Sequence, residues 1–149
     1  MKRILLSAAL LIFISTLHAQ TKEVVAVEKV LKGYQSKLEK LDTAGITKLF
    51  ASGAKVYEGG SDEGSIQNYL NHHLAPELKG FKSFDFSDYK VDVKVVGDYA
   101  YTAETYIYTI VLAKDNSQIK SKGVATSVLK KTNGEWKIEM THSSFRRAK

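Results

Sequence analysis

The chain has 149 residues, of which 44% are hydrophobic and 26% charged, and its formal net charge is +6. It contains no cysteine, which excludes disulfides, a thiolate metal site and a cysteine nucleophile. We therefore expect one domain held together by an ordinary hydrophobic core. The basic residues are spread along the chain, a pattern typical of a solvated surface, so we expect no nucleic-acid partner.

The N-terminus has the features of an export signal. A basic pair precedes a largely apolar run, and Leu17-His18-Ala19 resembles a cleavage site. The apolar run is shorter than the roughly 20 residues that span a bilayer, and a retained anchor helix is the alternative. We predict a signal peptide, residues 1–19, and a single mature domain, residues 20–149. The mature protein is then periplasmic or secreted, with no membrane anchor after cleavage.

Helical segments come first in the mature chain. Apolar residues recur at spacings of three and four, which predicts an amphipathic helix; they are Val24, Val27, Leu31, Tyr34, Leu38 and Leu41. A short second helix, 43–51, and a short strand, 54–58, are predicted to follow. A third helix is predicted to begin at Asp62 or Ser65 and to be stopped by Pro76.

Strands make up the rest of the chain. Alternating segments separated by turn residues predict four long strands, at 84–96, 99–112, 118–129 and 135–145. Asn133-Gly134 is typical of a tight hairpin turn, because both of its central residues need positive φ. The strand at 99–112 carries apolar groups on both faces, so both faces need cover. The helices can cover one face, and we predict a homodimer through the other.

This order of elements resembles the nuclear transport factor 2-like superfamily, in its SnoaL-like or ketosteroid-isomerase-like branch. The resemblance rests on the segment 42–50 and on the ending Gly134-Glu-Trp-Lys-Ile with His142 and Ser144. It implies an exported bacterial member with an α+β fold. In that fold a curved, mostly antiparallel sheet forms a cone-shaped barrel around three N-terminal helices and encloses a cavity, as in cystatin-like folds. The superfamily includes isomerases, dehydratases, cyclases, hydrolases and domains without chemistry, so the resemblance does not choose an activity.

The last strand suggests where a ligand would lie. With a period of two, Trp136, Ile138, Met140, His142 and Ser144 share one face. We expect this face to line the cavity. The predicted cavity residues are Tyr34, Tyr69, His73, Trp136, Met140 and His142.

The predicted cavity residues allow three kinds of chemistry. His73, His142 and Glu58 could converge as an open site for a divalent metal, since imidazole and carboxylate suit Zn²⁺. Tyr34 and Glu58 resemble the oxyanion donor and proton-shuttling carboxylate of ketosteroid isomerases. His142 could instead transfer protons with Glu58 or Glu104 as its acid partner, because imidazole titrates near neutral pH.

Function is therefore predicted only by class. The sequence lacks a complete catalytic set, which favours an exported domain that binds a small apolar or aromatic molecule and requires no cofactor. The alternatives are a proton-transfer enzyme that uses His142, Glu58 or both, and a periplasmic metal-binding protein that uses His73, His142 and Glu58.

Overall fold

The computed structural model describes residues 2–148, with side chains from residue 21 onward. Its elements are α1 (Lys2–Glu39), the 3-10 helix η1 (Ile46–Leu49), β1 (Phe50–Glu58), β2 (Ser61–Ser65), α2 (Ile66–Tyr69), the π-helix η2 (Leu70–Leu74), α3 (Ala75–Leu78), β3 (Phe81–Val96), β4 (Tyr99–Leu112), β5 (Gln118–Thr132) and β6 (Glu135–Arg147). The side chains of the predicted signal peptide, 1–19, lie outside the described ones. Among the described residues, no helix combines the length and hydropathy that a membrane span needs.

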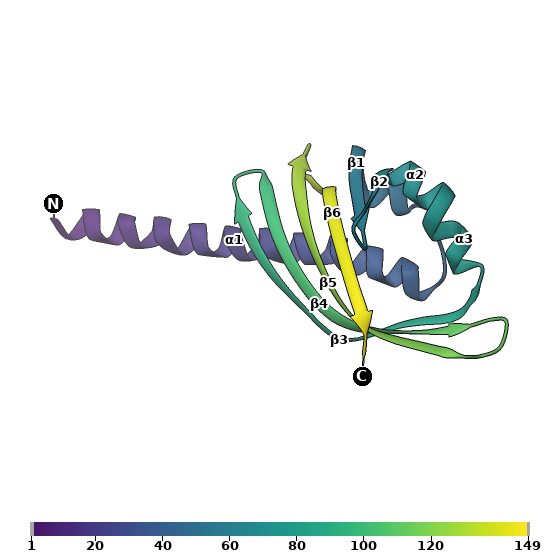
Figure 1. Ribbon diagram of the computed structural model, residues 1–149. Coiled ribbons are helices and arrows are strands. Elements are labelled where there is room, and N and C mark those ends of the chain that lie inside the picture. Colours follow the sequence, from purple (N-terminus) through teal and green to yellow (C-terminus); the bar gives the residue numbers. More distant parts are fainter. Residues whose placement is uncertain (1, 149) are drawn as a thin grey trace.

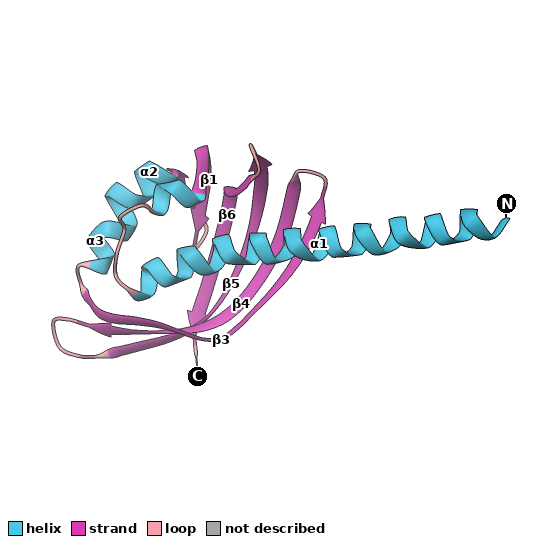
Figure 2. Cartoon of the chain, turned by 180° about the vertical axis from the view of Figure 1, so that it is seen from behind, coloured by secondary structure: helices cyan, strands magenta, loops and turns pink. Residues whose placement is uncertain are grey.

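All six strands form one sheet with the order β2-β1-β6-β5-β4-β3. Neighbouring strands are antiparallel except β1 and β6, which are parallel. The sheet is strongly curved; α1 crosses its concave side, and α2 and α3 close one end (Figures 1 and 2). The predicted fold class, an α+β cone of mostly antiparallel strands around N-terminal helices, is confirmed.

The first helix supplies one wall of the core. Val27, Leu31 and Leu38 are buried on one side of α1, as expected from their helical spacing. On the facing strand β3, the partly buried side chains of Val91 and Val93 pack against the same core. The space beneath α1 is therefore bounded by the helix on one side and by the long strands on the other.

Two predicted helix boundaries are wrong. The segment 43–51 forms only the short η1, because Gly45 adopts a left-handed φ of 77° and the chain is already extended at Phe50. The third helix begins where predicted, with the Ser65 hydroxyl accepting a hydrogen bond from the Asn68 N–H at 3.2 Å. It does not stop at Pro76: η2 leads directly into α3 with helical backbone angles at Leu74 and Ala75, so Pro76 is accommodated just after the π-turn.

The strand predictions are largely confirmed. Asn133 and Gly134 have φ values of 54° and 83°, as a hairpin turn of the predicted type requires. The first long strand, β3, contains a bulge: its register against β4 shifts between Ser87 and Lys90, and Asp88 has a φ of 52°. The strand β2 was not predicted, because its residues 61–65 are polar and carry no alternating pattern.

A second bulge overturns the predicted cavity face of β6. Ile138 pairs with Leu129 and Met140 pairs with Val128, so Glu139 is an extra residue without a partner on β5. A bulge of this kind exchanges the faces on which later residues lie. Trp136 therefore points inward, whereas Met140 and His142 lie on the outer face of the sheet, where both are exposed.

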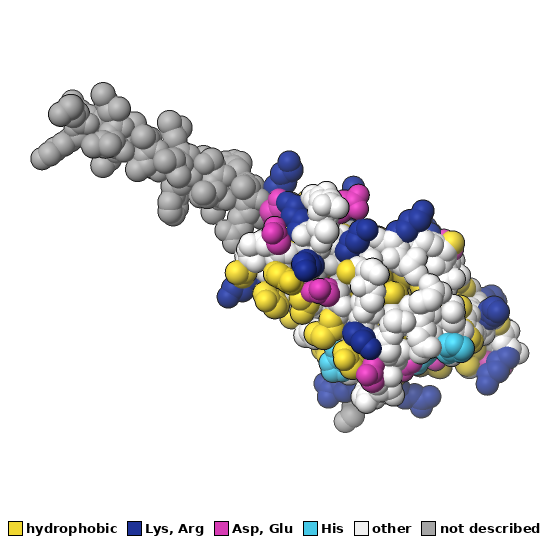
Figure 3. All heavy atoms as spheres, turned by 90° about the horizontal axis from the view of Figure 1, so that it is seen from above, with side chains coloured by type: hydrophobic (Ala, Val, Ile, Leu, Met, Phe, Trp, Pro, Cys, Tyr) yellow, Lys and Arg dark blue, Asp and Glu magenta, His cyan; other side chains and the backbone are white. Residues whose placement is uncertain are grey.

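Charges are mixed over the surface. On the face shown in Figure 3, Lys and Arg side chains are scattered among acidic, apolar and uncharged groups instead of forming one stripe. Apolar side chains also reach solvent, as is normal for a folded domain.

Candidate ligand cavity

A cavity of about 510 Å³ lies between α1, the short helices and the concave face of the sheet. Aromatic and aliphatic side chains form most of its lining: Leu31, Tyr34, Leu38, Val56, Tyr69, Leu74, Phe81, Phe84, Phe86, Tyr89, Tyr106, Tyr108, Ile110, Ile119, Ala125 and Phe145. The polar groups are fewer: Gln35, Glu58, Ser61, Glu63, His73, Glu77, Glu104, Ser127, Thr141 and Ser143. A mostly apolar hollow with a few polar groups is the usual form of a small-molecule site.

The structure brings only part of the predicted site to this cavity. Tyr34, Tyr69, His73 and Glu58 lie along it. Three predicted cavity residues, Trp136, Met140 and His142, are not among its lining. Trp136 is buried elsewhere in the core.

The bulge at Glu139 explains the difference for Met140 and His142. Inward positions on β6 continue as Thr141, Ser143 and Phe145. His142 is therefore not placed to transfer protons inside the cavity, either with Glu58 or with Glu104.

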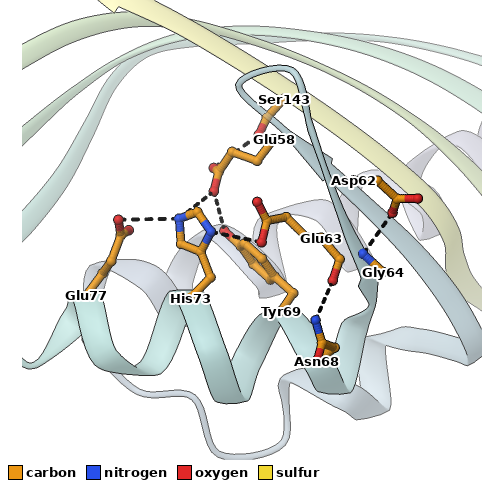
Figure 4. A network of polar contacts seen from close by, with 9 residues as sticks. All are labelled: Glu58, Asp62, Glu63, Gly64, Asn68, Tyr69, His73, Glu77 and Ser143. Carbon is orange, nitrogen blue, oxygen red and sulfur yellow. Dashed lines mark hydrogen bonds and ion pairs between the residues drawn. The ribbon is translucent and has the colours of Figure 1, made fainter.

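His73 is the centre of a carboxylate cluster at one end of the cavity (Figure 4). Its Nδ1 lies 3.0 Å from a Glu63 oxygen. Its Nε2 lies 3.3 Å from an oxygen of Glu58 and 3.3 Å from an oxygen of Glu77. The side chain of His73 is 29% exposed, so the cluster lies at the rim of the cavity and not deep in the core.

These contacts favour the charged imidazole. Burial lowers the pKa of His73, but the hydrogen bond with Glu63 and the negative charges of Glu77 and Glu58 raise it by more, and the net direction is upward. Burial raises the pKa of Glu77, and the neighbouring charge of Glu58 adds to the rise, whereas His73 opposes it. The cluster can thus hold one or more protons close to neutral pH.

Glu58 joins this cluster to the tyrosines. Its Oε2 accepts a hydrogen bond from the Tyr69 hydroxyl at 3.0 Å, and its Oε1 accepts one from the Ser143 hydroxyl at 3.2 Å. Burial, together with the charge of Glu58, raises the pKa of both Tyr34 and Tyr69. These two hydroxyls therefore stay protonated and remain hydrogen-bond donors at any physiological pH.

A second acidic group lies on another wall of the cavity. Glu104, on β4, accepts a hydrogen bond from the Tyr89 hydroxyl of β3 at 2.8 Å. Burial raises the pKa of Glu104, and the Tyr89 bond only partly opposes this. The negative charges of both Glu58 and Glu104 raise the pKa of Tyr106 further above its burial-driven rise, so the two carboxylates act on the same part of the cavity.

Local backbone structure positions the side chains of the His73 cluster. The π-turn at Leu70–Leu74 carries His73, and π-turns inside helices are frequent at functional sites. Glu63 lies on β2 and is held there by local hydrogen bonds: its carbonyl accepts one from the Asn68 side chain at 2.9 Å, and the neighbouring Asp62 accepts one from the Gly64 N–H at 2.8 Å.

The predicted metal triad does not form. His73 and Glu58 are neighbours, but His142 lies on the other face of the sheet. Among the residues that the structure describes, no group of three or more His, Cys, Asp or Glu side chains is arranged to hold a metal ion. The triad of His73, His142 and Glu58 is therefore wrong as a ligand set.

Several site residues were not singled out by the sequence interpretation. Glu77 follows His73 by four positions, which is helical contact spacing, and this signal could have identified it. Tyr106 shares strand parity with other inward residues of β4, and so does Glu104, which was considered only as a partner for His142. Glu63 and Tyr89 gave no signal, because each lies in or beside an irregular segment.

Comparison with known proteins agrees with this architecture. The sequence matches the family model of the SnoaL-like domain over residues 27–148. The chain therefore belongs to the SnoaL-like family of the nuclear transport factor 2-like superfamily. No curated protein sequence matches the chain.

Solved structures share the fold. A proposed ketosteroid isomerase from Shewanella frigidimarina is 27% identical, with a TM-score of 0.69 over 80% of this chain and 94% of that one. A nuclear transport factor 2-like protein from Salmonella enterica is 18% identical, with a TM-score of 0.74 over 89% and 94%. A hexachlorocyclohexane dehydrochlorinase from Novosphingobium barchaimii is 15% identical, with a TM-score of 0.67 over 85% and 88%. Structures related to this chain thus carry different activities.

Proposed function

We propose that this protein binds a small aromatic or otherwise apolar molecule in the cavity beneath α1. The observation that carries the proposal is the lining, in which aromatic side chains surround a volume of about 510 Å³ and polar groups occupy defined places. Ligand cavities usually measure about 300–1,000 Å³. Apolar surface left open in this way gains free energy when a ligand excludes water from it.

A neutral fluorescent probe tests the proposal. N-phenyl-1-naphthylamine gains fluorescence in apolar surroundings, and we expect it to bind the protein. Ala125 is buried on the cavity wall, so Ala125→Phe should fill the space and weaken probe binding about tenfold or more. Ala103→Phe is the matched control, because this position on the neighbouring strand is exposed. Equal probe binding by Ala125→Phe and the unsubstituted protein, both folded, would place the probe outside the cavity and contradict the proposal.

Proton transfer is the second candidate function. The supporting observation is that a carboxylate, Glu58, lies within 3.3 Å of an imidazole nitrogen of His73 and 3.0 Å of the Tyr69 hydroxyl, beside an apolar cavity. Glu58 would remove a proton from one ligand carbon and return it to another position of the ligand, the positively charged His73 beside it would hold Glu58 in place, and Tyr34 would donate a hydrogen bond to the developing oxyanion. The proposed isomerase and the dehydrochlorinase among the structural neighbours support this class of chemistry.

Ultraviolet absorbance tests this second function. Isomerisation of β,γ-unsaturated ketones and dehydration of β-hydroxy ketones both produce conjugated enones that absorb strongly. We expect turnover within such a panel, with Glu58→Gln and His73→Gln each lowering kcat/KM by about 10²–10⁴. Turnover that survives Glu58→Gln unchanged would exclude Glu58 as the base. His142→Gln is the control, since this exposed side chain lies on the other face of the sheet.

We also propose that residues 1–19 direct export and are then removed. Mass spectrometry of protein purified from its own host, after fractionation, should give a chain that begins at Gln20 in the periplasmic or secreted fraction. Recovery of a chain that retains residues 1–19 would contradict cleavage.

A further inference from the structure

The charge of the cavity is opposite to the charge of the protein. Four carboxylates line it, Glu58, Glu63, Glu77 and Glu104, and His73 is the one basic group among the described lining residues. The lining contains no Lys or Arg, although the chain as a whole has 22 of them and a net charge of +6. Acidic groups therefore outnumber basic groups in the lining by four to one, although burial raises the pKa of Glu77 and Glu104 and so favours their neutral forms.

The carboxylates are not one local cluster. Three of them surround His73 at the rim, whereas Glu104 lies on β4 with Tyr89 as its partner. The hydroxyls of Tyr34 and Tyr106 interact with the charges of both Glu58 and Glu104. Acidic side chains thus lie both at the rim of the cavity and on its sheet wall.

Aromatic side chains line the cavity together with these carboxylates. Phe84 and Phe86 stack with ring centroids 4.8 Å apart, and Phe86 meets Tyr106 edge-on at 5.3 Å. The negative face of an aromatic ring attracts a cation, and this attraction is stronger where water is excluded. Carboxylates set among aromatic rings are the chemistry that recognises ammonium groups.

We propose that the ligand of this cavity is an organic ammonium compound, with a positively charged nitrogen held among the carboxylates and tyrosines and an apolar or aromatic body against the phenylalanines. This inference rests on the proposed binding function and names the charge of the ligand. Carboxylates in partly buried surroundings are disfavoured as charges unless they are paired. The imidazolium of His73 can pair with only part of the cluster, and a bound ammonium group would pair with the rest.

Three probes of similar shape test the charge selectivity. These are 2-phenylethylamine, which is cationic at pH 7, 2-phenylethanol, which is neutral, and phenylacetate, which is anionic. Titration calorimetry with the full mature protein, in about 150 mM salt to screen surface charge, should give a Kd for the amine at least about tenfold below that of the alcohol. Phenylacetate should bind more weakly than the alcohol.

Variants locate the selectivity. Glu104→Gln and Glu58→Gln should each reduce the preference for the amine about threefold or more while changing the Kd of the alcohol by less than about twofold. Glu135→Gln is the matched control, because this side chain is 73% exposed on the β5–β6 hairpin. It should leave the preference unchanged.

Each outcome separates the two proposals. If the alcohol or phenylacetate binds as tightly as the amine, or if neither cavity variant changes the preference, the ammonium inference is wrong while the binding function stands. If none of the three probes binds and N-phenyl-1-naphthylamine does not bind either, the proposed binding function fails, and the inference fails with it.

Discussion

At the scale of single residues, Glu104 is a group whose charge works against the fold. Burial raises the pKa of its carboxyl, and the Tyr89 hydrogen bond offsets only part of that rise. An acid whose pKa is higher in the folded state binds more protons when folded. Its unfavourable contribution therefore begins as pH rises past the unfolded value of about 4.3 and is complete above the folded pKa.

Glu104→Gln should remove this penalty while keeping a carbonyl that can accept the Tyr89 bond. We expect the variant to melt about 2–5 °C above the unsubstituted protein at pH 8, with the difference shrinking towards zero near pH 4. Thermal unfolding followed by circular dichroism across this range measures it. Glu135→Gln, at an exposed carboxylate, should show no such trend, and a Glu104→Gln variant that is less stable at pH 8 would contradict the account.

Gly123 is required by the ring beside it. A Cβ at this position would lie 2.1 Å from a ring carbon of Tyr106, so Gly123→Ala must displace that ring from the cavity wall. We expect a loss of about 1–3 kcal/mol in the free energy of unfolding, measured by urea denaturation. Tyr106→Leu should cost less in the Gly123→Ala background than alone. Strictly additive costs would mean that the ring is not what excludes a larger residue.

Sequence patterns identified the site residues that lie on regular elements. Tyr34 and Tyr69 follow from helical spacing, and Glu58 follows from strand alternation next to Val56. The prediction placed His142 on the wrong face of the sheet, because the single unpaired residue Glu139 reverses the inward–outward alternation of β6. No pattern in the local sequence indicates this bulge. The contact between Glu63 and His73 depends on the path of the chain from β2 through α2 to η2, and no sequence pattern indicates it.

At the scale of elements, α1 is tied to the last hairpin through Glu23. One oxygen of Glu23 accepts a hydrogen bond from the Lys131 ammonium at 2.7 Å, and the other accepts one from the Trp136 indole N–H at 2.6 Å. These bonds lower the pKa of Glu23, first through Lys131 and then through Trp136. The helix α1, which covers the cavity, is therefore attached to β5 and β6 through the two carboxylate oxygens of Glu23.

Glu23→Ala should loosen this attachment. We expect faster amide hydrogen exchange in the turns of α1 around Glu23 and a lower melting temperature at pH 7. Because the pKa of Glu23 is depressed in the folded state, its stabilisation is present above the unfolded value of about 4.3 and is lost as pH falls through the folded pKa. The two proteins should therefore converge below about pH 4. Glu135→Ala controls for loss of a carboxylate, and unchanged exchange in α1 would refute the tie.

Element types were predictable where the pattern was long. The strand 99–112 has the predicted bounds, because turn residues flank it on both sides, at Gly97-Asp98 and Asp115-Asn116. The bounds of the short segments were not predictable: Gly45 breaks the expected second helix, and the helix continues past the π-turn through Pro76. In both cases one backbone conformation decided the outcome, and helical periodicity carries no information about it.

At the scale of the whole molecule, the outer face of the sheet retains an apolar strip. Tyr101 pairs with Val128, and Val128 pairs with Met140, so the three lie side by side on this face. Tyr101 is 51% exposed and Met140 37% exposed. We propose that a second copy of the chain covers this strip in a two-fold symmetric dimer, which would need to bury more than about 1,000 Å².

Met140→Lys places a charge in this strip and should convert the dimer to a monomer. Light scattering at micromolar concentration measures the mass of both proteins. Val25→Lys is the control, since Val25 is 57% exposed but lies on α1, and it should remain dimeric. A monomeric mass for the unsubstituted protein would refute the dimer outright.

The bulge at Glu139 also has a consequence for how roles are transferred between relatives. One extra residue in a strand moves the side chain of every later residue to the opposite face of the sheet. Thr141, Ser143 and Phe145 are cavity positions in this chain, and Met140 and His142 are surface positions. In a relative whose final strand lacks the extra residue, the residues aligned with these positions would lie on the opposite faces of the sheet. Residues of this strand should therefore be matched by counting from the C-terminal side of the bulge, since a gapless alignment through it would equate a ligand contact with a surface residue.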